Sequence, residues 1–234
     1  MTTQTWTFQS IARVHSPLTE KFGLPRQPGL VKSLQCQIEI LPPYDRDEAF
    51  RELSGYSHIW LLSVFHMHLR DHWQATVRPP RLGGNDRVGV FASRAPYRPN
   101  PIGLSLCALQ GITREQGRLM LSVNGCDLVD GTPVIDIKPY LPYTDSVADA
   151  RAGFAPDEPA RQLSVSWSPG AQQQLAQVCT EYPDLQVLVE ELLAQDPRPA
   201  YQRERAEYGM RVYAFNIRFS VNASQAIILS LDMD

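Results

Sequence analysis

The segment Leu34-Gln35-Cys36-Gln37-Ile38-Glu39-Ile40 alternates apolar and polar side chains without a break. A period of two residues is typical of a β-strand with one face in the core and the other in solvent. Further segments of the first two-thirds of the chain also have strand character, namely 59–65, 88–92, 102–106, 119–123 and 132–137. Only 45–53 has helical character here, with Asp45 as a candidate cap and Glu48 three residues later.

About six strands with little helix between them favour an antiparallel sheet closed into a barrel over a doubly wound sheet. No two glycines of the chain stand two positions apart, so the chain lacks the G-x-G-x-x-G fingerprint of dinucleotide-binding folds. We therefore expect a mainly β fold, built on a small non-Rossmann β-barrel.

The composition changes after residue 145, where prolines, aspartates and alanines are typical of a linker or surface loop. Beyond it, a short strand over 161–167, a helix start at Ser168-Pro169 and helical spacing over 183–195 are followed by strand patterns at 213–219 and 226–231. We predict a barrel domain over 1–145, a linker over 146–160 and a small α+β domain over 161–234.

Charge and composition exclude several classes of protein. The 234 residues carry a formal charge of -3, which argues against indiscriminate binding to nucleic acid. The longest apolar run, 59–65, is far shorter than the ~20 residues that a membrane span needs, and the first ten residues do not resemble a secretory signal. The four cysteines are widely spaced, so we expect reduced, buried thiols in a cytoplasmic protein.

Positive charge is concentrated in one loop region. Residues 78–98 include five arginines and a single acid, Asp86, which gives a local charge of +4. Guanidinium groups bind carboxylates and phosphates through two hydrogen bonds, and Tyr97 offers a surface on which a base could stack. A solvated loop with scattered arginines is the alternative, but the clustering among prolines and glycines favours an anionic ligand. The region leaves room for one localised RNA site.

Three other segments are weaker candidates for binding. Pro25-Arg26-Gln27-Pro28-Gly29 is a second loop suited to an anion. The carboxylates of Asp127 and Asp130 could serve a ligand or simply form a turn, and spacing alone leaves both readings open. The segment 195–201 places an arginine and a tyrosine directly after the predicted helix, with Arg203 and Arg205 further on, and this group could bind RNA.

Four of the five histidines lie between positions 58 and 72, which raises the question of a metal site. Ordinary strand and loop histidines are the favoured interpretation, and we predict no metal. A metal-dependent hydrolase built on His66, His68 and His72 is the alternative.

Six motifs together resemble the TsaA-like (TrmO) family. They are RQPGLVK from Arg26, RPPRLGGN from Arg78, GVFASR from Gly89, RPNPIGLSL from Arg98, DLVDGTPVIDIKPYLPY from Asp127 and AQDPRPAY from Ala194. The resemblance implies S-adenosylmethionine-dependent methylation of N6 of N6-threonylcarbamoyladenosine, next to the anticodon of tRNA. It also implies a β-barrel catalytic domain and a homodimer with the site near the subunit interface.

The resemblance also implies particular site residues. The cofactor would be bound by Pro25, Arg26, Gln27, His66, Met67, Arg94, Leu104, Asp127, Leu128, Val129 and Asp130. A D-P-R-x-x-Y motif in the C-terminal domain would contribute to tRNA recognition through Asp196, Pro197, Arg198 and Tyr201.

Methyl transfer is an in-line displacement, so the protein mainly supplies proximity and orientation. The accepting nitrogen is of the urea type, and its proton has to be removed or strongly polarised; the base is not identified. We hypothesise that Asn100 orients the purine or ureido group, and that Arg98 or Arg94 pairs with the threonyl carboxylate. A non-catalytic RNA-binding barrel is the alternative function.

Overall fold

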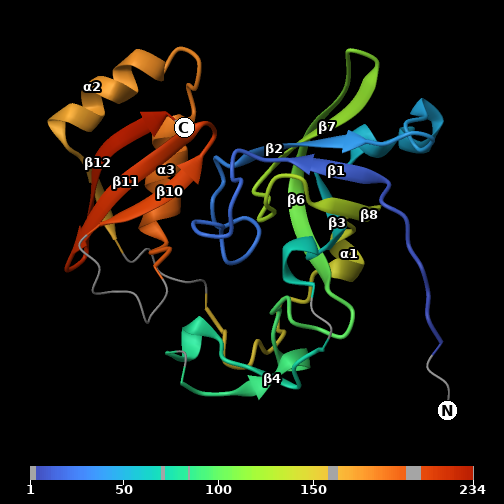
Figure 1. The fold of residues 1–234 in the computed structure, drawn as a ribbon. Helices are drawn as coiled ribbons and strands as arrows, with labels where there is room; N and C mark the ends of the chain where they lie inside the picture. Colours follow the sequence, from blue (N-terminus) through green and yellow to red (C-terminus); the bar gives the residue numbers. More distant parts are fainter. Residues whose placement is uncertain (1–3, 70–71, 84, 158–162, 199–206, 234) are drawn as a thin grey trace.

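The computed structural model describes residues 4–69, 72–83, 85–157, 163–198 and 207–233. Figure 1 shows two sheet-containing parts, an N-terminal barrel and a C-terminal sheet with helices against it, joined by a loop between them. The candidate RNA-binding residues Tyr201, Arg203 and Arg205 and the predicted strand residues 161–162 lie outside the described residues.

Six antiparallel strand pairs close the N-terminal part into a barrel, in the order β1-β2-β7-β6-β3-β8. The strands are Ala12–His15 (β1), Gln35–Ile40 (β2), His58–Val64 (β3), Ile102–Glu115 (β6), Arg118–Asn124 (β7) and Pro133–Pro139 (β8). The expectation of a mainly β fold is confirmed. The antiparallel pairing also differs from the parallel sheet of doubly wound folds.

Alternation along the strands determines which side chains enter the barrel. On β2, Cys36, Ile38 and Ile40 point inward and are at most 2% exposed. On β6 the inward positions nearest the start of the strand are Gly103 and Ser105, which leave that end of the interior less apolar. The barrel therefore has an apolar core and a polar end, and the polar end faces the loops with the candidate site residues.

Two sequence-based predictions in this part are wrong. Residues 45–53 form no α-helix but two short 3-10 turns, Asp47–Phe50 (η1) and Leu53–Gly55 (η2), and neither turn contains a buried residue. Without an apolar face to bury, a capping pattern alone does not stabilise a helix. The predicted strand over 88–92 is also shorter, because β5 (Val88–Gly89) gives way to a 3-10 turn, η5 (Val90–Ala92).

The C-terminal part is a four-stranded sheet in the order β10-β11-β12-β9 with two helices. Its elements are β9 (Ser164–Trp167), α2 (Pro169–Val178), α3 (Leu185–Ala194), β10 (Tyr208–Val212), β11 (Phe215–Asn222) and β12 (Gln225–Met233). The Ser168 hydroxyl accepts a 3.2 Å hydrogen bond from the Ala171 amide, which caps α2 as predicted. Throughout the described ranges, no helix has the length and apolar character needed to cross a membrane.

The long loop between β1 and β2 contacts the C-terminal sheet. A Cβ on Gly23, whose φ is +90°, would lie 2.3 Å from the Met210 sulfur, so only glycine allows this approach. The Glu191 carboxylate of α3 accepts hydrogen bonds from the Ser33 amide and hydroxyl at 3.0 and 2.8 Å. The loop that carries the first candidate cofactor residues is thus held by both parts of the chain.

The cysteines are all reduced. Cys36, Cys107 and Cys126 are buried in the barrel, whereas Cys179 is exposed at the end of α2, which corrects the expectation of four buried thiols. Contact with the neighbouring thiol and burial raise the pKa of Cys36 well above its ordinary value, so this thiol is protonated and unreactive.

Candidate active site

The loop over 25–29 is fixed at both of its ends. The Arg26 guanidinium donates a 3.1 Å hydrogen bond to the Asp196 carbonyl in the C-terminal part. The Gly29 amide donates to the Gly125 carbonyl at 2.8 Å, and a Cβ on Gly125 would lie 3.2 Å from the Gly29 Cα. Glycine at position 125 lets the two backbones meet, which brings this loop next to the turn at 127–130.

Arg94 joins the arginine-rich loop to this first loop. Its Nη1 donates a 2.7 Å hydrogen bond to Oε1 of Gln27. Arg94 is exposed, and it also acts electrostatically on Asp127. Three of the predicted cofactor-binding positions, although about 100 residues apart in sequence, therefore lie together in space.

Arg98 contacts the backbone of its own loop. Its Nη1 lies 2.7 Å from the Ser93 carbonyl oxygen, 3.2 Å from that of Val90 and 3.4 Å from that of Ala95. Its Cζ also lies 5.8 Å from the centre of the Phe91 ring. These contacts favour a role in shaping the loop rather than contact with a substrate carboxylate. Asn100, in contrast, is exposed.

Asp127 is a partly buried carboxylate at the polar end of the barrel. Its Oδ1 accepts a 2.5 Å hydrogen bond from the Ser105 hydroxyl. Burial raises the pKa of Asp127 above its ordinary value, while the Ser105 hydrogen bond and the charge of Arg94 act in the opposite direction. The neighbouring Ser63 hydroxyl, also directed into the barrel, is buried and has no hydrogen-bond partner in the described structure.

Asp130 has a structural role in the same turn. Its carboxylate accepts a 3.0 Å hydrogen bond from the Ser16 amide, and its own amide donates to the Leu18 carbonyl at 2.8 Å. Leu128 and Val129 between the two acids are 4% and 7% exposed. The two readings left open by the sequence thus divide between the acids: Asp130 anchors the turn, and Asp127 faces the polar end of the barrel.

The remaining predicted cofactor residues lie near the C-terminal end of β3. His66 and Met67 lie on a 3-10 turn, η3 (His66–His68), and the Lys21 ammonium donates a 2.7 Å hydrogen bond to the Met67 carbonyl. Leu104 lies on the outer face of β6 and is 53% exposed. His68 contacts the rings of Phe65 and Tyr97. The described residues contain no group of three or more His, Cys, Asp or Glu side chains arranged to hold a metal ion.

The D-P-R segment after α3 is buried. Arg198 is 8% exposed, and its Nε and Nη2 donate to the two oxygens of the Asp196 carboxylate at 2.7 and 3.0 Å. The Asp196 hydrogen bond holds the pKa of Arg198 above its ordinary value. Pro197 lines a small cavity together with Pro25, Arg26 and Leu192. These contacts hold Arg198 against Asp196 within the C-terminal part, and the Asp196 carbonyl links this segment to Arg26.

Sequence reasoning missed two residues that hold the site. Ser105 fixes the Asp127 carboxylate, and Lys21 fixes the backbone at Met67. A polar residue at an inward position of an alternating strand is a signal that identifies Ser105. Lys21 offers no such signal, because its contact depends on how two distant loops meet.

Two sequence-family models match the chain, the tRNA-methyltransferase O N-terminal domain at residues 13–146 and the TrmO C-terminal domain at residues 160–234. A tRNA (adenine(37)-N6)-methyltransferase of Escherichia coli is 44% identical over 228 residues, covering 96% of this chain and 97% of the relative. A putative S-adenosylmethionine-dependent methyltransferase RcsF of Pseudomonas aeruginosa is 48% identical, covering 89% of this chain and 90% of that one.

The fold has a match among solved structures as well. The crystal structure of TrmO from Pseudomonas aeruginosa superposes with a TM-score of 0.81 at 37% identity, covering 98% of this chain and 99% of that one. Sequence and fold agree over nearly the full length, which confirms the resemblance drawn from the motifs. The chain belongs to the tRNA-methyltransferase O family.

Proposed function

We propose that this chain transfers a methyl group from S-adenosylmethionine to N6 of adenine 37 in tRNA, and that the adenine already carries the threonylcarbamoyl group. The observation that carries the proposal is the convergence of Gln27, Arg94 and Asp127 at one end of the barrel, within a chain that matches a relative named tRNA (adenine(37)-N6)-methyltransferase over 96% of its length.

The side chains at this end of the barrel fit the cofactor's chemistry. The exposed Arg94 guanidinium can bind a carboxylate, and the Asp127 carboxylate can accept from an ammonium or a ribose hydroxyl. The exposed apolar surfaces of Met67 and Leu104, at 43% and 53%, can cover a purine ring. Bound S-adenosylmethionine supplies an electrophilic methyl group on a sulfonium sulfur. Pro25, Arg26, His66, Leu128, Val129 and Asp130 contribute backbone and shape to the same site.

The chain's contribution to the reaction is orientation. Arg94 and Gln27 brace one another, and Ser105 holds the Asp127 carboxylate in one orientation, so the binding groups are in place before the ligands arrive. Asn100 projects from a Pro-Asn-Pro corner whose rigid backbone limits its movement. It donates and accepts hydrogen bonds and would orient the purine or ureido group. Arg98 is a positioning residue that keeps this loop in shape.

Exposed apolar side chains beside the site support a homodimer. Ile102 and Leu104 are 38% and 53% exposed on the outer face of β6, and Met67 and Leu69 after β3 are 43% and 63% exposed. Register pairs Val64 with Ile102 and Leu62 with Leu104, which makes these outward positions neighbours. Exposed apolar side chains on and beside two paired strands are suited to contact with a second copy of the chain.

We assign different roles to the two parts of the chain. The barrel, within residues 1–145, would bind the cofactor and carry out the transfer. The α+β part, within 161–234, would contact tRNA beyond the target base, and 146–160 would link the two. Asp196, Pro197 and Arg198 would support this by fixing the surface of the second part, and Tyr201 would contact the tRNA. Because the proposed substrate is tRNA, the expected compartment is the cytoplasm.

One reconstitution tests the proposal. The purified chain is incubated with tRNA that contains threonylcarbamoyladenosine and with S-adenosylmethionine labelled in its methyl group, and the nucleosides are analysed by mass spectrometry. We expect the label on N6 of the threonylcarbamoylated nucleoside. Binding of tRNA without any label transfer or cofactor binding would instead support the non-catalytic RNA-binding alternative.

A further inference from the structure

Trp73 and Phe91 form an exposed stacked pair that no step of the proposed reaction uses. Their ring centres are 6.3 Å apart with an interplanar angle of 25°. Trp73 is 52% exposed and Phe91 is 73% exposed. Two large aromatic rings held parallel in solvent bury little surface within the chain, so their arrangement needs a different explanation.

The backbone explains why the two rings meet. A two-stranded ribbon pairs Thr76 of β4 (Thr76–Val77) with Gly89 of β5, and a 3.0 Å hydrogen bond from the Val90 amide to the Ala75 carbonyl continues it. Phe91 follows Val90 on the 3-10 turn η5, and Trp73 lies two residues before Ala75, so both rings lie at the same end of the ribbon. Val90 is 1% exposed and anchors the ribbon, so Phe91 is directed outward by a fixed neighbour.

Arg98 supports the pair from the side. Its guanidinium carbon lies 5.8 Å from the centre of the Phe91 ring, while its Nη1 is bound to the carbonyls of Val90 and Ser93. This contact combines a cation–π interaction with backbone hydrogen bonds and holds the ring in one orientation. The aromatic surface is therefore preorganised rather than adaptable.

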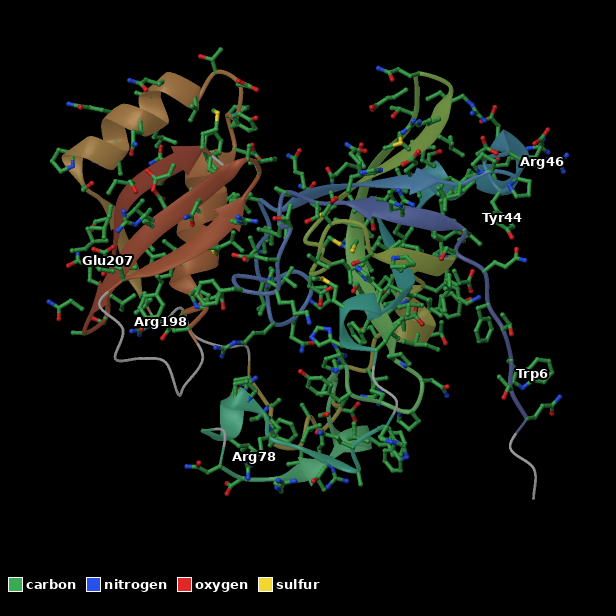
Figure 2. The ribbon with its side chains drawn as sticks, viewed as in Figure 1. Trp6, Tyr44, Arg46, Arg78, Arg198 and Glu207 are labelled. Atoms are coloured by element: carbon green, nitrogen blue, oxygen red, sulfur yellow. The ribbon has the colours of Figure 1, made fainter. Side chains whose placement is uncertain are left out.

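The surroundings of the pair are strongly positive. Five arginines lie in the same loop region with one acid, at positions 78, 81, 87, 94 and 98. Within the described residues, none of these five arginines forms a salt bridge with a carboxylate. Figure 2 shows Arg78 at the lower edge of the molecule on the loop that leads from β4. A stacked aromatic surface among unneutralised arginines matches the way proteins bind unpaired nucleotides.

We propose that Trp73 and Phe91 are a stacking platform for an unpaired base of the RNA, one that flanks the target adenine. This rests on the proposed function, because it assumes an RNA substrate at the neighbouring cofactor site. Phe91 is three residues from Arg94, which contacts Gln27, so the platform and the candidate cofactor site are within about 10 Å of chain. A second copy of the chain is the competing occupant, since aromatic and arginine side chains are also enriched at protein interfaces, and the sedimentation measurement below distinguishes it.

Alanine substitution at each ring tests the platform. We measure the affinity of Trp73→Ala and Phe91→Ala for a labelled RNA hairpin with an unpaired loop adenine, and for a blunt RNA duplex of the same length. We expect the dissociation constant for the hairpin to rise roughly 5- to 150-fold, with little change for the duplex. The ring-preserving variants Trp73→Phe and Phe91→Tyr should retain most of the affinity.

Trp6→Ala and Phe8→Ala are matched controls, because these rings are 71% and 67% exposed on the N-terminal segment. Figure 2 shows Trp6 away from Arg78. Unchanged hairpin affinity in both platform variants would overturn the proposal. Loss of the dimer in sedimentation, with normal hairpin binding by the remaining protein, would also overturn it and identify the face as a contact between copies.

Methyl transfer and hairpin binding by the wild-type chain distinguish a failure of this inference from a failure of the proposed function. If wild type methylates tRNA and the platform variants do so with unchanged hairpin affinity and unchanged KM, the platform is wrong and the function stands. If wild type neither binds the hairpin nor transfers the methyl group, both are wrong. Cofactor affinity, measured by calorimetry, should be the same in wild type and in all the aromatic variants.

Discussion

The arginines of the 78–98 loop and Arg198 of the C-terminal part are both sequence candidates for RNA binding, yet the structure places them in opposite environments. The exposed Arg78 has no carboxylate partner among the described residues, whereas Arg198 is 8% exposed and bound to both oxygens of Asp196. The difference teaches that a nearby acid decides whether an arginine is available to a ligand more than the number of arginines in the segment does. An aspartate two positions before an arginine can engage it, and such an arginine then serves packing rather than a ligand.

The largest expected effect is on the buried pair. Asp196→Ala leaves the Arg198 guanidinium buried without its counter-charge, so we expect the free energy of unfolding to fall by about 3–5 kcal/mol. Urea denaturation measures this loss. The double variant Asp196→Ala/Arg198→Met also removes the unpaired buried charge, so it should recover a large part of the lost free energy of unfolding. Equal stability of Asp196→Ala and wild type would contradict a structural role for the pair.

Arg94 is intermediate between the two environments, because it is exposed but braced by Gln27. We expect Arg94→Ala to weaken S-adenosylmethionine binding roughly tenfold to a hundredfold, since a charge-assisted hydrogen bond is lost. Isothermal calorimetry measures the affinity, and the unfolding curve should stay close to that of wild type. Arg87→Ala in the same loop serves as the control and should leave cofactor affinity unchanged.

Substitution of Arg78 tests whether the exposed arginines of the 78–98 loop bind RNA. Arg78→Ala should change the free energy of unfolding by less than about 0.5 kcal/mol. It should lower the slope of log affinity for tRNA against log salt by roughly 0.7–0.9, the value expected for one lost phosphate contact. Arg46, which is exposed far from Arg78 in Figure 2, supplies the control substitution. Equal slopes for both variants and wild type would remove the 78–98 loop from the RNA-binding surface.

The smallest expected effect concerns Asp127, a carboxylate with no arginine at salt-bridge distance among the described residues. Burial raises its pKa in the folded state, so folded protein retains this proton over a pH range in which unfolded protein has lost it. The free energy of unfolding should therefore decrease as pH rises from the ordinary aspartate pKa to the raised value. Asp127→Asn should remove this part of the pH dependence, whereas Asp86→Asn on the exposed loop should not.

Much of the barrel could be predicted because its strands show either a clear alternation, as at 34–40, or a continuous apolar run, as at 59–65. β2, β3 and β7 lie where the pattern places them, and β1 was missed because four residues are too few to establish a period. The helix predicted over 45–53 was wrong because a capping pattern was counted without an apolar face. The correct strands and the wrong helix have one physical cause: burial of a continuous apolar face stabilises a helix or strand more than capping residues at its ends do.

The candidate site was predictable mainly through its motifs. Their resemblance named Gln27, Arg94 and Asp127, which the structure brings together. No local signal distinguishes Arg98, bound to its own loop, from Arg94, directed toward Gln27. The Trp73–Phe91 pair could not be predicted either, because it depends on the register of a ribbon with strands of two residues each.

The hydrogen bonds from Arg26 to the Asp196 carbonyl and from Ser33 to Glu191 have a thermodynamic consequence. The loop with the candidate cofactor residues is hydrogen-bonded to the C-terminal part of the chain. A ligand that orders this loop therefore also stabilises the C-terminal part. Such linkage is reciprocal: occupancy of one half must alter the affinity of the other by the same factor. Under the proposed function, a cofactor bound to the barrel and RNA bound to the C-terminal part would be coupled through this loop, and the order in which the two ligands arrive would not change the coupling free energy.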